Sequence, residues 1–159
     1  MRWTALVLLA GAMFFAYIFM DILSPLQSLL QTSRGWTPEA FGHYAGSETF
    51  LNVFVFFLIF AGIILDKMGV RFTAVLSGTV MFIGGAINYY AVTDAFAGSA
   101  LDTFFTNHLN LPQAWWNVTP WFEGMPASAK LAACGFMVFG CGAEMAGITV
   151  SRGSVKWFT

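Results

Sequence analysis

The chain has 159 residues, of which 58% are hydrophobic and only 9% are charged, and its formal net charge at pH 7 is −1. Soluble domains carry about 25% charged residues, so this composition excludes an ordinary soluble protein and indicates an integral membrane protein. The sequence also has no basic patch, which excludes a nucleic-acid-binding protein.

Four long apolar segments have the length of membrane-spanning helices. A span needs roughly 20 mostly apolar residues, and continuous rather than alternating apolar runs argue against strands. The first segment is too long for a signal peptide and has no small-residue cleavage site, and Pro25 should kink or end it. The sequence therefore predicts an all-α bundle of four transmembrane helices near residues 4–30, 41–65, 72–93 and 130–151.

The basic residues predict how this bundle is oriented. With four spans, both termini and the loop after the second span share one side of the membrane, and most basic residues fall on that side. These residues are Arg2, Lys67, Arg71, Arg152 and Lys156, against Arg34 and Lys130 on the other side. Because cytoplasmic loops are rich in Lys and Arg, we expect both termini in the cytoplasm of a bacterial cell, with the chain in its plasma membrane.

The loop between the second and third spans is dense in glycine and charge. Residues 62–71 read GIILDKMGVR between two apolar runs. This segment resembles the signature loop of the major facilitator superfamily, G-x-x-x-D-[RK]-x-G-[RK]-[RK], and departs from it only at Val70, where a basic residue is usual. A motif in its expected structural context is more specific than a bare pattern. The residues at the motif positions are Gly62, Asp66, Lys67, Gly69 and Arg71.

The resemblance implies a fold, a function and a gate. Superfamily members have about twelve helices in two halves, so residues 1–159 would form the N-terminal part of one domain, helices one to four. The chain closes on Thr159 without a polar tail, and we expect it to be truncated, with the remaining helices of the same protein as its partners. In the superfamily, the acid of this loop pairs with basic groups at the cytoplasmic helix ends and closes the inner gate. Here Asp66 would be that acid, with Arg71 and Arg152 as candidate partners.

The implied function is secondary active transport of a small polar solute by alternating access. The alternative is a small four-helix membrane protein with a structural or scaffolding role. An enzyme is not expected, because the sequence contains no catalytic cluster within the spans and no ATP-binding motif. Neither a cofactor nor a metal site is expected, because His43 and His108 have no ligand-like spacing with Cys or carboxylates.

Three acidic residues lie within the predicted spans: Asp21, Glu48 and Glu144. Ionisable groups at this depth are costly and are candidates for substrate or proton binding. Tyr17 is one helical turn from Asp21, and Asn52 is one turn from Glu48. In the superfamily the first and fourth helices line the central cavity, so Tyr17, Asp21 and Glu144 are expected to face it. For Asp21 and Glu48, the alternative is a position in water near the outer interface.

A narrower likeness concerns the cargo. Asp21 followed by Leu26 and Gln27, and Glu144 followed by residues 156–158, resemble segments of the lysosomal dipeptide transporter branch and its bacterial relatives. This likeness implies short peptides or other organic ions as cargo, with Glu144 binding the amino group of the substrate. A buried carboxylate can instead carry the proton in proton-coupled transport.

Two other regions carry expectations. Residues 94–129 are predicted to form a long extracytoplasmic loop, which is either a lid or contact surface or an interfacial segment whose aromatic residues sit at the headgroups. Trp36 is likewise expected at the outer interface. Small residues at four-residue spacing predict helix-packing seams. They are Ala74 and Gly78 on the third helix and Ala143, Gly147 and Ser151 on the fourth.

Overall fold

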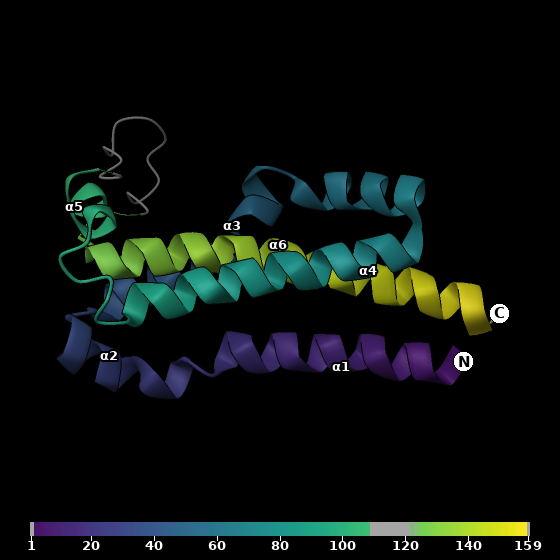
Figure 1. The fold of residues 1–159 in the computed structure, drawn as a ribbon, viewed down its shortest axis with the longest axis horizontal. Coiled ribbons are helices and arrows are strands. Elements are labelled where there is room, and N and C mark those ends of the chain that lie inside the picture. Colours follow the sequence, from purple (N-terminus) through teal and green to yellow (C-terminus); the bar gives the residue numbers. More distant parts are fainter. Residues whose placement is uncertain (1, 109–121, 123, 159) are drawn as a thin grey trace.

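The computed structural model describes residues 2–108, 122 and 124–158, and within these residues the fold is all-helical (Figure 1). The elements are α1 (Arg2–Asp21), the 3-10 helix η1 (Ser24–Leu26), α2 (Gln27–Arg34), α3 (Pro38–Phe54), α4 (Phe57–Val92), α5 (Ala100–Asn107) and α6 (Ala127–Phe158). Three stretches are long and apolar enough to cross a membrane: Trp3–Arg34, Phe57–Val92 and Ala127–Lys156. The prediction of an all-α fold is therefore confirmed, and the apolar helices agree with a membrane protein, but three candidate spans are found among the described residues where four were predicted.

The first predicted helix is interrupted near Pro25, as expected. α1 ends at Asp21, and Pro25 lies within η1, because proline cannot donate the backbone hydrogen bond that an α-helix needs there. α2 then runs to a left-handed residue, Gly35, with φ 68°. Thr37 starts the next helix by accepting a hydrogen bond from the Ala40 N–H with its side chain.

The prediction of one continuous helix over residues 41–65 is wrong. α3 ends at Phe54, and Phe56 takes a left-handed backbone, with φ 53°, before α4 begins at Phe57. The surrounding run, VFVFFLIF, holds neither glycine nor proline, but its β-branched and aromatic residues have weak helix propensity. The predicted second helix is thus two helical pieces.

The predicted third helix follows a turn at Gly69. This residue has φ 80° and ψ 168°, a conformation essentially restricted to glycine, and it divides α4 into pieces 57–68 and 70–92. Figure 1 shows the chain reversing here, at the end of the molecule where both termini lie. The expected tight turn within the glycine-rich loop is therefore present.

α6 is the central helix of the bundle. In its apolar window, 72% of the residues are buried, against 17% for α4 and 6% for the window that begins in α1. It packs against α1, α3, α4 and α5. Each neighbouring helix packs one face against α6 and leaves its other face exposed, as expected for helices that meet lipid or further helices.

Glycines of α6 allow this close packing, but they are not those predicted. A Cβ on Gly135 would lie 3.0 Å from the Asn88 backbone nitrogen, one on Gly142 would lie 2.8 Å from the Ser77 carbonyl, and one on Gly140 would overlap the Glu48 carbonyl. The expected seam is wrong at Gly78 and Gly147, whereas Ala143 of the same predicted seam is buried in the core. A Cβ on Gly78 would meet open space, and one on Gly147 would approach only Met13, at 3.8 Å.

Polar contacts fasten the end of the bundle opposite the termini. Arg34 forms an ion pair with Asp94, Nη2 to Oδ1 at 2.6 Å, which joins the end of α2 to the segment after α4. Trp36, expected at the interface, is instead 1% exposed. Its Nε1 donates to Ser128 Oγ at 3.0 Å.

The described part of the predicted loop is structured. It contains α5, whose carbonyl at Phe105 accepts a 3.0 Å hydrogen bond from the Lys130 ammonium group. Lys130 is only 3% exposed, and its positive charge at the C-terminal end of α5 suits the helix dipole. The remaining loop residues, 109–121 and 123, lie outside the described part of the chain.

Candidate functional site

Acidic side chains from different helices interact across the bundle. Glu48 on α3 and Glu144 on α6 are both half-buried, whereas Asp21, at the end of α1, is exposed. Glu48 is partly desolvated by its burial, and the carboxylates of Glu144 and Asp21 are near enough to act on it electrostatically. The fold therefore brings Glu144 and Asp21, which the sequence places in other spans, within electrostatic range of Glu48.

The position of Glu48 follows from helix packing. Its backbone carbonyl lies against Gly140 of α6, where no larger residue fits. Glu144 is one helical turn after Gly140, so it lies near the same stretch of α3. This contact between backbones places the two carboxylates about one helical turn apart along the α3–α6 interface, where either a cation or a shared proton would relieve their repulsion.

Asn52 lies one turn beyond Glu48 on α3. Its side chain is 8% exposed, and neither its Oδ1 nor its Nδ2 has a hydrogen-bond partner among the described residues. A buried amide without a partner is costly, so this group is available to bind a ligand. Tyr17, by contrast, is 59% exposed on α1, so the structure does not gather it with these buried side chains.

Helical spacing places Tyr44 in line with Glu48 and Asn52, but sequence reasoning did not pair it with Asn88. Tyr44 on α3 is 2% exposed and stacks on Phe136 of α6, with ring centroids 4.7 Å apart. Its hydroxyl faces Asn88 of α4, yet neither group makes a well-formed hydrogen bond. For Asn88, the available signal was that it is the single amide in an uncharged span. We assign this pair to packing between helices.

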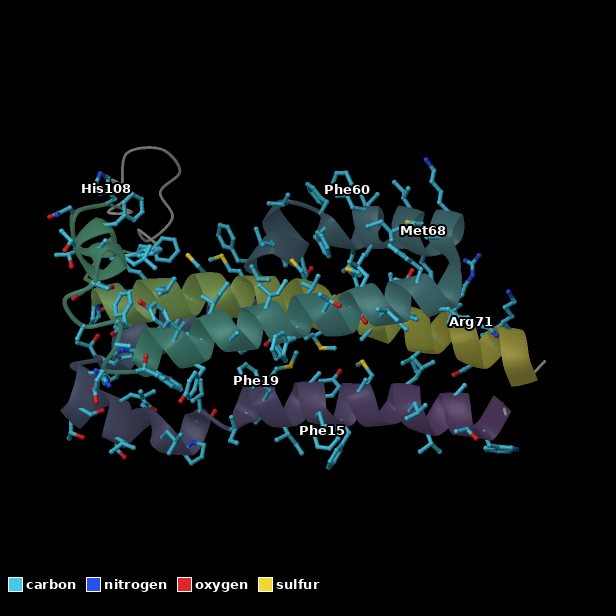
Figure 2. All side chains as sticks on the ribbon, viewed as in Figure 1. Phe15, Phe19, Phe60, Met68, Arg71 and His108 are labelled. Carbon is cyan, nitrogen blue, oxygen red and sulfur yellow. The ribbon has the colours of Figure 1, made fainter. Side chains whose placement is uncertain are left out.

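An ion pair joins the glycine-rich loop to α6. Arg152 Nη2 lies 2.8 Å from Asp66 Oδ1, and each side chain is 60% exposed. The structure thus pairs Asp66 with Arg152 rather than with Arg71, the other expected partner, and Figure 2 shows Arg71 beyond the turn, near the end with the termini. A cavity of about 390 Å³ surrounds the pair and is also lined by Gly69 and Lys156.

The other loop residues have less specific surroundings. Lys67 is exposed, and Gly62 lies within the helical piece 57–68, where an added Cβ would meet open space. On the same piece, Phe60 lies on the side facing away from the bundle (Figure 2). The structure therefore brings together Asp66, Gly69 and Arg152, but not Gly62 or Lys67, around the cavity.

An apolar groove lies elsewhere, between α1, α4 and α6. Its volume is about 610 Å³, and its lining includes Phe15, Phe19 and Phe82. Phe19 also packs on Phe139 of α6, with ring centroids 4.4 Å apart. A lining dominated by hydrocarbon offers little to a charged solute, so we place the candidate site at the acidic side chains.

No family model, no curated protein and no solved structure matches this chain. What the chain does is therefore inferred from its own residues.

Proposed function

We propose that this chain is the N-terminal part of a secondary active transporter that moves a small polar solute across a bacterial plasma membrane by alternating access. The observation that carries the proposal is the pair of half-buried carboxylates, Glu48 and Glu144, on two helices of an apolar bundle whose backbones meet at Gly140. Ionisable groups at such depth are rare and costly, and they usually mark a substrate or proton pathway. In this proposal the other helices of the two-half fold complete the cavity.

The distribution of basic residues supports the orientation that the proposal requires. The end that holds the termini and the Gly69 turn also carries most of the Lys and Arg residues (Figure 1). By the positive-inside rule this end is cytoplasmic. The Asp66–Arg152 pair then lies at the inner side of the membrane, where a gate that closes the cytoplasmic exit would be.

The strength of that ion pair suits a gate. Exposed pairs contribute roughly 0–1 kcal/mol, so the Asp66–Arg152 contact can break and form again in each transport cycle. It would hold the loop against α6 in the outward-facing state and release it in the inward-facing state. A proton or solute shifts this equilibrium only by its different affinities for the two states.

The chemistry of the acids indicates the cargo. Two half-buried carboxylates favour a bound ammonium group, a proton or both. Short peptides carry an ammonium group, and they are the cargo implied by the likeness to the lysosomal dipeptide transporter branch. We therefore propose short peptides or similar organic cations as substrates, with Glu144 in contact with the amino group.

Uptake by the full-length gene product in proteoliposomes tests the proposal. With a panel of radiolabelled dipeptides and an imposed pH gradient, Glu144→Gln should abolish uptake, because it removes the charge while keeping the size of the side chain. Glu39→Gln is the matched control, because the Glu39 side chain is 78% exposed at the start of α3, and it should keep normal uptake. Normal uptake by a correctly inserted Glu144→Gln protein would contradict the proposal.

A further inference from the structure

The break between α3 and α4 lies deep within the predicted second span. At about 1.5 Å per residue, Val55 is roughly 20 Å from the turn at Gly69. Around the break, the Val55 N–H donates to the Leu51 carbonyl at 3.2 Å, and the Ile59 N–H donates to Phe56 at 3.0 Å. The Val55-to-Leu51 bond is the last of the α3 ladder, so the carbonyls of Asn52 and Val53 belong to the last turn, which has no intrahelical donors.

Open carbonyls at this depth require another partner. Non-helical backbone within a bilayer is tolerated only where it is buried in protein or lines a hydrated cavity. The carbonyls of this last turn also form the negative end of the α3 dipole, which attracts positive charge. The broken helix therefore creates a region that favours a cation.

The side chain of Asn52 is a second, independent indication of a ligand. It lies in the last turn of α3, is only 8% exposed, and leaves its Oδ1 and Nδ2 without partners. One turn earlier, Glu48 adds a carboxylate whose charge is repelled by Glu144. The same end of α3 thus carries three kinds of oxygen atom. They are the side-chain amide oxygen of Asn52, the backbone carbonyls of the last turn and the carboxylate of Glu48.

We propose that the α3 break is a sodium site, with Asn52 Oδ1 and the carbonyls of Asn52 and Val53 as ligands and Glu48 as the nearby negative charge. Broken transmembrane helices bind sodium in this way elsewhere, through open carbonyls at a helix end. Mainly neutral oxygen ligands suit a monovalent ion better than Ca²⁺, whose sites use several carboxylates. The inference rests on the proposed function in one respect: it makes sodium the coupling ion.

Thermal unfolding of the purified protein in detergent tests the site without transport. A ligand that binds only the folded state raises the unfolding temperature as its concentration rises. Sodium chloride should stabilise the protein saturably over potassium chloride at equal ionic strength. Asn52→Ala should raise the sodium concentration needed by about tenfold or more, since even outer partners of metal ligands contribute that much.

A matched variant separates loss of a ligand from loss of a buried amide. Asn88→Ala removes another buried asparagine with an unpartnered amide, but in the continuous part of α4, so it should keep the wild-type sodium response. Equal loss of the response in both variants would overturn the site, as would an unchanged response in Asn52→Ala. If Asn52→Ala fails to fold, Asn52→Asp keeps an oxygen ligand and should retain saturable binding of radioactive sodium, and its absence there would also overturn the site.

The outcomes also separate the site from the proposed function. If the wild-type protein melts identically in sodium and potassium but takes up dipeptides in a pH gradient, the sodium site is overturned and transport stands. If it binds sodium saturably but takes up no solute, the site stands and the transporter proposal fails.

Discussion

At Gly140, the backbone of α6 meets the backbone of α3. A Cβ at this position would overlap the Glu48 carbonyl, whereas a Cβ on Gly147 of the same helix would approach only the flexible end of Met13, at 3.8 Å. These glycines therefore differ in the space around them but share a helical backbone. Gly140 sets how close the candidate site residues on α3 and α6 can come.

Gly140→Ala should therefore lower the free energy of unfolding by about 1–3 kcal/mol, because overpacking forces the two backbones apart. Gly147→Ala should instead raise it by about 0.5–1 kcal/mol, because alanine fits there and loses less conformational entropy than glycine in a helix. Unfolding of each variant with rising concentrations of a denaturing detergent measures both changes in free energy. Equal stability of Gly140→Ala and the wild type would contradict the close approach of α3 and α6.

Candidate residues could be named from the sequence, but most of their partners could not. Asp21, Glu48 and Glu144 are visible because a charge in an apolar run is unusual, and Asn52 follows from helical spacing. Tertiary packing decides which groups meet across helices. Spacing alone left Arg71 and Arg152 equally available to Asp66 and gave no sign that Trp36 would be buried against Ser128.

At the scale of elements, glycine and proline marked the turns well. Pro25 ended the first helix, and Gly69 reversed the chain. The break at Phe56 could not be predicted, because it has no such residue and the apolar run continues through it. An apolar run shows that a segment enters the membrane, but it does not show whether the helix within it is continuous.

Substitution of Phe56 tests the break directly. Left-handed backbone costs a non-glycine residue roughly 1–2 kcal/mol, so Phe56→Gly should stabilise the protein by about 1 kcal/mol or somewhat less after the loss of side-chain contacts. Phe60→Gly, within a helical piece and similarly exposed, should destabilise it by about 0.5–1 kcal/mol. If thermal unfolding shows both variants destabilised alike, α3 continues through Phe56 and the sodium site loses its basis.

At the scale of the molecule, composition was sufficient for the class of protein and insufficient for the arrangement. Few charges and long apolar runs indicated a helical membrane protein. The central place of α6 was not visible, because its apolar runs resemble those of α1, in which only 6% of the apolar window is fully buried. α6 is more buried because its glycines let the neighbouring helices pack closely against it. This effect depends on tertiary packing and is not visible in the composition.

The Asp66–Arg152 pair predicts a change in the accessibility of the inner end. Asp66→Ala should raise the labelling rate of a cysteine introduced at Val155, which lines the same cavity, by up to about fivefold, because the lost pair is worth at most about 1 kcal/mol. Asp94→Ala breaks the Arg34–Asp94 pair at the opposite end and should leave that rate unchanged. An unchanged rate in Asp66→Ala would count against the gate.

Solute counterflow tests the central claim of alternating access most directly. Vesicles containing the full-length wild-type protein are loaded with an unlabelled dipeptide and diluted into a trace of the labelled one, without an ion gradient. A carrier whose site faces one side at a time should accumulate the label transiently above its external concentration, because returning sites are occupied by unlabelled solute. If the label equilibrates no faster than in protein-free vesicles for every dipeptide and organic cation tried, the chain does not belong to a transporter of this kind.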